Sequence, residues 1–270
     1  MNNVYDFFEF WAPYWSVIED NLLDMASINK LSNMFVAPVL VVGAGQGILV
    51  EQLKNEGLEV DGIDFCPTMI KYAKQRRNID LIEADASSMP FTDNAYQSAI
   101  IATGVMDFMD DKKTIEQIIN EVKRVTRNKD YIFIAFARMD PQIEKTMRCL
   151  GLISEDRILL KRFAELTRLK PGEFLAKIIK SPNVSTIGAI LSLIKTWLFL
   201  PYKDRRLSDN FKKMWQKAQE EKSNLDSLID SVPDRIPFRG EAHIRKLFSE
   251  MEISITDIYT SYSCMVAHLQ

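Results

Sequence analysis

Three alternating glycines and one aspartate are the residues of this chain whose types and spacing best suit ligand chemistry. The glycines lie within residues 43–47, directly after the apolar run 39–42, and Asp64 closes a second apolar run 21 residues after Gly43. Such a run is typical of a buried parallel strand, and glycines let the backbone turn sharply and approach a ligand closely. A helix starting near Gln46 would aim its free N–H groups at that ligand. An acidic residue at about this offset accepts ribose hydroxyls, so the pattern favours a nucleoside.

The glycine spacing resembles the nucleoside loop of the class I S-adenosylmethionine-dependent methyltransferases. A dinucleotide loop needs its third glycine one place later, where Ile48 stands. The resemblance continues in the right order over about residues 35–138, and its small-molecule branch (methyltransferase type 11-like) fits best. The further matching segments are 58–73, 83–86, 89–91, 100–109, 121–125 and 132–136.

The resemblance implies the following cofactor contacts. The glycine turn lies under the methionine part, Asp64 accepts both ribose hydroxyls, and an aromatic residue of the N-terminal cover closes over the cofactor. Other side chains and one backbone N–H hold the adenine. The expected cofactor-binding residues are Gly43, Ala44, Gly45, Gly47, Asp64, Phe65, Met69, Asp85, Ala86, Thr103 and Tyr14.

Each of these residues also has an ordinary structural explanation. The glycines suit any tight strand–helix turn, Asp64 suits a helix cap ahead of Pro67, and Asp85 suits a turn. Tyr14 suits plain packing of an N-terminal helix. Two departures from the family pattern, Val41 and Gln97, stand where an acidic residue is usual, which leaves open a chain that binds the cofactor without transferring methyl groups.

Methyl transfer depends largely on positioning and desolvation, so it requires no fixed catalytic motif. Asp107, at the expected end of the fourth strand, is the best-placed base for a hydroxyl acceptor. Its alternative role is capping the helix expected at Lys112. The two histidines, His243 and His268, fall in late elements and suit structural roles, and no metal site is expected.

The alternation of strand and helix patterns predicts an α/β fold. We expect a doubly wound, Rossmann-like sheet of about seven strands with the last antiparallel, and a helical insertion before the final helix and strands. Helices are expected to begin near Gln46, Pro67 and Lys112, with a late one at 241–249. Strands are expected near 38–42, 59–63, 79–82, 97–102, 130–137, 252–260 and 262–269.

Three parts follow from this reading. Residues 1–34 are expected to form an N-terminal helical cover, 35–139 and 236–270 the cofactor-binding core, and 140–235 a helical insertion or lid. Residues 144–217 hold 16 Lys and Arg against 7 Asp and Glu, within a chain of net charge −3. That asymmetry suggests a partner that only the insertion contacts.

The apolar stretch 187–200 lies inside the basic insertion. It reads as a buried lid helix, a homodimer contact, a wall for a lipophilic or anionic small-molecule acceptor, or a peripheral membrane contact. It is too short to span a bilayer. The three scattered cysteines and the N-terminus without a signal-peptide pattern favour a reduced, cytoplasmic setting.

We therefore expect a small-molecule methyltransferase that uses S-adenosylmethionine. Three other readings stay open: a nucleic-acid methyltransferase using the basic segment, a cofactor-binding scaffold without catalysis, and a nucleotide-dependent oxidoreductase on the same sheet topology. No recognised nucleic-acid-binding motif is visible in the sequence.

Overall fold

The computed structural model describes residues 3–16, 32–109, 111–137, 141–155, 157–159, 161–162, 236–237, 241–260 and 264–269, with isolated positions between 173 and 220. The chain divides into two compact units: residues 1–7 with 139–238, and residues 8–138 with 239–270. The assignment of 1–34 and 140–235 to a cover and a lid stays a prediction. The apolar stretch 187–200 and most of the basic insertion lie outside the described residues.

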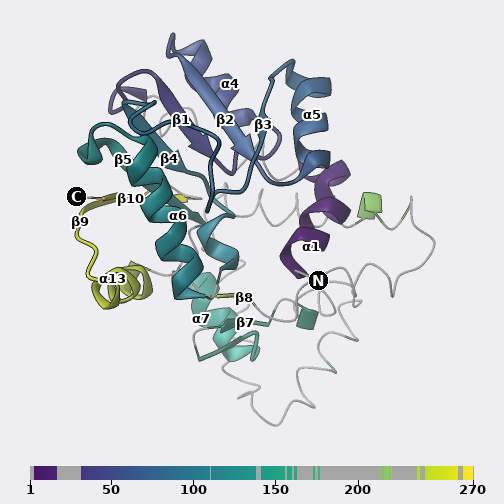
Figure 1. Cartoon of the computed structure of the whole chain (residues 1–270). Coiled ribbons are helices and arrows are strands. Elements are labelled where there is room, and N and C mark those ends of the chain that lie inside the picture. Colours follow the sequence, from purple (N-terminus) through teal and green to yellow (C-terminus); the bar gives the residue numbers. More distant parts are fainter. Residues whose placement is uncertain are drawn as a thin grey trace. The chain divides into compact units, whose positions relative to one another are not determined.

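The unit of residues 8–138 and 239–270 contains a seven-stranded sheet (Figure 1). Its strand order is β3-β2-β1-β4-β5-β10-β9, with β10 antiparallel to both neighbours and the other described pairs parallel. The strands are β1 (Val39–Val42), β2 (Val60–Asp64), β3 (Ile82–Glu83), β4 (Ser98–Ile101), β5 (Ile132–Ala137), β9 (Ile255–Thr260) and β10 (Cys264–Leu269). The predicted fold class is confirmed, including the antiparallel last strand.

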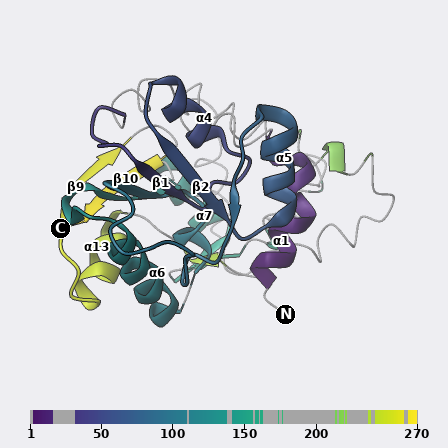
Figure 2. The same cartoon turned by 45° about the horizontal axis from the view of Figure 1, so that its top comes forward.

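Helices cover both faces of this sheet because its central strands are apolar on both sides. The alternate residues Leu40 and Val42 pack with α6 (Lys112–Val125) and α13 (Glu241–Glu250), whereas Val39 and Val41 pack with α4 (Ile48–Asn55) and α5 (Pro67–Arg77). Figures 1 and 2 show these two helix pairs on opposite sides of the sheet. Continuous apolar strands of this kind are typical of parallel sheets buried on both faces.

The remaining described elements are short. They are α1 (Asn3–Trp11) and the 3-10 turns η1 (Ala12–Tyr14), η2 (Met106–Phe108) and η3 (Lys129–Tyr131). The unit of residues 1–7 and 139–238 contains α7 (Pro141–Cys149) and a three-stranded sheet of β6 (Ile153–Ser154), β7 (Arg157–Ile158) and β8 (Ile236–Pro237). No helix within the described ranges is long and apolar enough to cross a membrane.

Three local predictions differ from the structure. The third strand begins at Ile82, not near 79, because Asn78 adopts a left-handed backbone and the Ile79 N–H bonds to the Ala73 carbonyl to end α5. The first helix of the core begins at Ile48, since Gly47 has φ +82° and Gln46 belongs to the preceding turn. The insertion, 140–235, was expected to be helical, but it also contains β6 and β7 of the small sheet, and β8 follows directly after it; these two-residue strands are too short to show alternation.

Gly62 is the position where β2 packs most closely on its neighbours. A Cβ there would lie 2.6 Å from Leu81 Cδ2, 2.8 Å from Val50 Cγ2 and 3.0 Å from Ala44 Cβ. We predict that Gly62→Ala lowers the free energy of unfolding by ~1–3 kcal/mol, measured by denaturant titration, because the core must be overpacked to accept it.

The control for this prediction is Gly57→Asn. Gly57 has φ +85° and no atom within 4 Å of its ideal Cβ, and asparagine tolerates the left-handed region. Its free energy of unfolding should change by less than ~1 kcal/mol. Equal destabilisation by the two substitutions would contradict the packing explanation for Gly62.

Candidate functional site

The glycine turn, residues 43–47, links β1 to α4. Gly43, Gly45 and Gly47 have φ of +73°, +57° and +82°, a region that only glycine enters readily. A Cβ on Gly43 would lie 2.1 Å from Val105 Cγ2, and one on Gly47 would lie 3.3 Å from both Ala73 Cβ and Ile79 Cγ2. The left-handed backbone and the packing within the protein therefore already favour glycine at positions 43 and 47, whatever binds above them.

Asp64 lies at the carboxyl end of β2, beside the glycine turn. Its Oδ2 atom accepts the Gly45 N–H at 2.7 Å, and its Oδ1 atom accepts the Cys66 N–H at 2.9 Å. The side chain is buried, and burial raises its pKa to about 6 against the opposing effect of these hydrogen bonds; the nearby Glu9 carboxylate raises it further. Asp64 is thus a buried carboxylate that protonates close to neutral pH.

Sequence reasoning missed Glu9, which connects the N-terminal segment to the turn after Asp64. Its Oε1 atom accepts the Cys66 thiol at 3.1 Å and the Thr68 N–H at 3.2 Å, and its Oε2 atom accepts the Thr68 hydroxyl at 2.6 Å. Glu9 therefore caps α5, whose own N-cap Cys66 makes no side-chain capping bond. Burial opposes ionisation of Glu9, but the hydrogen bonds from Thr68 and Cys66 outweigh it and lower the pKa.

The same environment makes Cys66 a poor nucleophile. Burial, followed by the hydrogen bond to Glu9, raises the pKa of its thiol to about 12. A thiol with that pKa stays protonated at neutral pH, and only the thiolate attacks. Cys66 therefore serves as a hydrogen-bonding core residue between Asp64 and Glu9.

Gln46, in the middle of the glycine turn, is a second residue that sequence reasoning missed. It is fully buried; its Nε2 atom donates to the Ala12 carbonyl at 2.6 Å, and its Oε1 atom accepts from Arg76 Nη1 at 2.8 Å. Arg76 Nη2 also donates to the Pro13 carbonyl at 3.0 Å. The sequence does show a polar residue between two glycines. The neighbouring residues, however, do not indicate which groups its side chain bonds to.

Aromatic side chains gather near this corner of the sheet. The Phe8 ring lies edge-on to those of Phe65, Phe108 and Trp15, with centroid separations of 6.0, 5.2 and 5.4 Å. Phe65 is 39% exposed, so it offers an apolar surface beside Asp64. Edge-to-face packing of this kind adds to the stability that burial alone supplies.

Tyr14 and Met69, two predicted cofactor contacts, are both covered in this structure. They are 2% and 1% exposed, and the Met69 sulfur lies 3.8 Å from Gln46 Nε2. The Tyr14 ring lies 6.1 Å from that of Trp11. Their predicted contact with a ligand therefore requires movement of the segment that covers them.

Asp85 and Ala86 lie in the loop after β3. Asp85 is exposed, and its Oδ1 atom accepts both the backbone N–H and the hydroxyl of Ser87 at 2.7 Å. The predicted turn role of Asp85 is therefore present. Its predicted contact with adenine stays a prediction, as does that of the half-buried Ala86.

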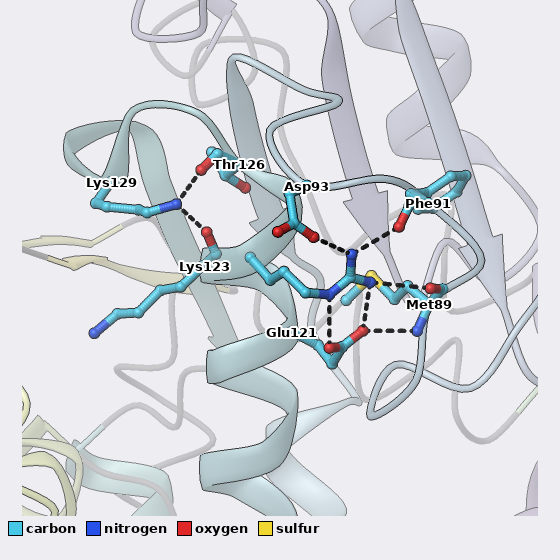
Figure 3. Close-up of polar contacts among 8 residues, drawn as sticks. Met89, Phe91, Asp93, Glu121, Lys123, Thr126 and Lys129 are labelled. Atoms are coloured by element: carbon cyan, nitrogen blue, oxygen red, sulfur yellow. Dashed lines mark hydrogen bonds and ion pairs between the residues drawn. The ribbon is translucent and has the colours of Figure 1, made fainter.

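Arg124 on α6 ties the same loop to the helix, and Figure 3 labels its partners Met89, Phe91, Asp93 and Glu121. Its guanidinium donates to the carbonyls of Met89 and Phe91 at 3.1 and 2.7 Å, and it pairs with Asp93 at 2.9 Å and with both oxygens of Glu121. Glu121 in turn accepts the Met89 N–H at 2.9 Å. Hydrogen bonds from Arg124 lower the Glu121 pKa, so both groups stay charged at neutral pH.

Asp107 lies in η2, after β4. It is buried, and its Oδ2 atom accepts the Gly104 N–H at 2.7 Å. The alternative role predicted for it, capping α6, is wrong: Asp111 caps that helix by accepting the N–H groups of Lys113 and Thr114. Thr103 lies half-buried in the same turn, and its predicted contact with the cofactor stays a prediction.

The described residues contain no group of three His, Cys, Asp or Glu side chains that could hold a metal ion. His268 stacks on Phe133 with a centroid separation of 4.8 Å, a structural role. Val41 is fully buried in β1, and the Gln97 N–H bonds to the Pro38 carbonyl. Neither of these two departures disturbs the glycine turn.

Comparisons with known proteins agree with this geometry. Residues 39–129 match the family described as methyltransferase domain. A demethylmenaquinone methyltransferase of Paenarthrobacter aurescens is 30% identical over 121 residues, which are 42% of this chain and 47% of that protein. Another, from Corynebacterium kroppenstedtii, is 29% identical over 179 residues, which are 63% of this chain and 77% of that protein.

A solved S-adenosylmethionine-dependent methyltransferase of Methanosarcina mazei has a TM-score of 0.50 at 14% identity, covering 91% of this chain and 98% of that one. That likeness shows the fold. The chain spans about half the length of the first curated relatives it matches, 47% and 51%.

We predict that Arg124→Met loosens the loop of residues 85–93. Several hydrogen bonds and two ion pairs vanish, so the free energy of unfolding should fall by ~1–2 kcal/mol. Amide hydrogen exchange should become faster at Met89 in particular. Arg245→Met is the control, because Arg245 forms a described pair only with the exposed Glu241 on its own helix. Equal effects of the two substitutions would refute a role for Arg124 in holding the loop.

Proposed function

We propose that this chain, whose core is a class I S-adenosylmethionine-dependent methyltransferase domain, transfers a methyl group to a small-molecule acceptor. One observation carries the proposal: the glycine turn after β1 is bonded through Gly45 to the buried Asp64 carboxylate at the end of β2. The strand order reverses between β1 and β4, and ligands of open α/β sheets bind outside the carboxyl ends of the strands at such a point.

The residues at this edge fit the cofactor. The backbone of the glycine turn approaches without side chains at positions 43, 45 and 47, and Asp64 offers a carboxylate that can accept ribose hydroxyls. We expect Phe65, Asp85 and Ala86 to hold the adenine, with Thr103, Met69 and Tyr14 completing the site. When bound, S-adenosylmethionine supplies a methyl group on a sulfonium. The chain's own contribution is to orient the two reactants and to exclude water.

The acceptor is proposed to be small and lipophilic. The matched relatives are named demethylmenaquinone methyltransferases, which favours a lipophilic quinone-type acceptor for this chain. The Phe8, Phe65 and Phe108 cluster near the carboxyl ends of β2 and β4 supports an apolar acceptor. The insertion of residues 140–235 is proposed as a lid over the acceptor.

Two assays test this function. Calorimetry should show binding of S-adenosylmethionine and no binding of NAD, which separates the proposal from an oxidoreductase. Transfer of a radiolabelled methyl group should then be measured with short-chain hydroquinones and with RNA as acceptors. Labelled hydroquinone supports the proposal; labelled RNA would favour the nucleic-acid alternative, and binding without transfer to any acceptor would favour a scaffold.

We predict that cofactor binding weakens as the pH falls below about 6. Ribose hydroxyls donate to the ionised form of Asp64, and burial raises its pKa to about 6, so at pH 5 only about one-tenth of the protein is competent. The apparent Kd should therefore rise about tenfold between pH 7.5 and pH 5. The pKa of Asp64 in the folded chain exceeds the ordinary value of an aspartate. Protonation of Asp64 therefore does not lower the free energy of unfolding as the pH falls from 7.5 to 5.

Variants separate Asp64 from other sources of pH dependence. Asp64→Asn should bind weakly at every pH, and Asp64→Ala should bind more than about tenfold more weakly, since charge-assisted bonds of ~1.5–3 kcal/mol each are lost. Gly45→Val should abolish binding because the left-handed backbone and the close approach are both lost. The control is Asp61→Asn, an exposed aspartate on the same strand that accepts the Tyr96 hydroxyl. Wild-type affinity in all three site variants would sink the cofactor assignment.

We predict that Asp107→Asn lowers kcat by ~10²-fold or more for a hydroxyl acceptor, with little change in cofactor affinity. Asparagine keeps an oxygen that can accept the Gly104 N–H, so the turn is preserved while the base is removed. Asp111→Asn, at the exposed cap of α6, is the control. If kcat of Asp107→Asn matches wild type across the pH range, Asp107 is confined to its turn-stabilising role.

A further inference from the structure

A polar latch connects the N-terminal strap, defined here as residues 8–15, to the glycine turn. The Gln46 amide uses both ends: Nε2 donates to the Ala12 carbonyl at 2.6 Å, and Oε1 accepts from Arg76 Nη1 at 2.8 Å. Gln46 and Ala12 are both 0% exposed. If the hydrogen bond between Gln46 and Ala12 broke while both groups stayed buried, each would lose its partner, which costs free energy.

Arg76 completes the latch from α5. Its Nη2 atom donates to the Pro13 carbonyl at 3.0 Å, and its guanidinium lies 4.5 Å from the centre of the Tyr72 ring, one turn earlier on the helix. The Arg76 residue is exposed, so its bond to the Pro13 carbonyl of the strap lies in contact with water. Bonds of that kind are of modest strength, which suits a contact that must open repeatedly.

The strap is also attached at its other end. Glu9 bonds to Cys66 and Thr68, the residues that directly follow the Asp64 turn, while Gln46 lies between Gly45 and Gly47. The two attachments therefore flank the corner where Asp64 accepts the Gly45 N–H. Tyr14, within the strap, and Met69, beneath it, are 2% and 1% exposed. A ligand that touches either residue can do so only after the strap has moved.

We propose that Gln46 and Arg76 are positioning residues that hold the strap closed on the glycine turn and so set how fast the cofactor and its demethylated product exchange. The closed strap shields the turn and keeps Gln46 and Gly45 in place. Release of the latch frees residues 12–14 while the Glu9 attachment keeps the strap near its site. The inference about cofactor exchange rests on the proposed function, whereas the inference that Gln46 and Arg76 hold the strap closed does not.

The first arm of the test uses the full chain without cofactor. Arg76→Met removes both guanidinium bonds from an exposed helix position, so the fold should be retained. Lys74→Met is the matched control, because Lys74 lies on the same helix and pairs with the exposed Asp80. Amide hydrogen exchange over residues 11–15 should become roughly three- to tenfold faster in Arg76→Met and stay at the wild-type rate in Lys74→Met. Gln46→Leu, which removes the buried amide, should produce at least the same acceleration.

The second arm measures ligand exchange by stopped-flow fluorescence, using Trp11 and Trp15 in the strap as reporters and S-adenosylhomocysteine as the probe. Arg76→Met should release the probe roughly three- to tenfold faster than wild type and than Lys74→Met. The rate of a single turnover with both substrates bound should stay unchanged in Arg76→Met. Faster probe release with an unchanged single-turnover rate distinguishes control of ligand exchange from a role in the chemical step.

The outcomes are distinct. Wild-type hydrogen exchange over residues 11–15 in both Arg76→Met and Gln46→Leu would overturn the latch. Faster hydrogen exchange with unaltered probe release would overturn its control of cofactor exchange. If the wild-type chain binds neither S-adenosylmethionine nor the probe, the proposed function fails, whereas the latch is still decided by the first arm.

Discussion

The Asp64 carboxylate joins the two turns on which the rest of the site depends. It accepts one N–H from the turn after β1 and one from the turn that starts α5, with bond lengths of 2.7 and 2.9 Å. Both donors are backbone groups, so the carboxylate fixes the course of the chain as well as the position of a side chain. Burial makes this arrangement electrostatically costly, which is why the pKa rises to about 6.

The N-terminal segment extends this arrangement. Glu9 supplies the cap that α5 lacks, and its negative charge at a helix N-terminus is favourable because of the free N–H groups there. The same carboxylate approaches Asp64 closely enough to raise its pKa, with the Cys66 thiol and N–H between the two acids. The segment therefore affects the charge of the site as well as its access.

Two further loops at the carboxyl edge are held by polar side chains, one from a distant helix and one from within the loop itself. Arg124 on α6 binds the carbonyls of the loop after β3, and Asp107 binds the backbone of the turn after β4. Loops positioned by a rigid scaffold commonly carry binding residues. Here the scaffold is a sheet buried on both faces, and Arg124 connects the loop after β3 to a helix of that scaffold through charge-assisted hydrogen bonds.

The sequence by itself determined the fold class, the strands that are apolar on both faces, and the position of the glycine turn and Asp64. These features are local: the four apolar residues of β1 end at Gly43, and β2 ends at Asp64, so neighbouring residues specify both patterns. Packing of Val105 against Gly43 and of Ala73 against Gly47, in contrast, became visible only in three dimensions.

Only the tertiary structure decided the partners of Gln46, Glu9 and Arg124. Their key contacts join residues 34, 57 and 35 positions apart, and a hydrogen bond is specified by the geometry of both groups, not by the type of either one. For the same reason the small sheet of β6, β7 and β8 was not predicted, since β8 pairs with β7 across a long stretch of chain. The sequence left capping of α6 open as one of two roles for Asp107, but Asp111 forms the cap, because capping depends on the backbone angle at one residue and not on the presence of an acid nearby.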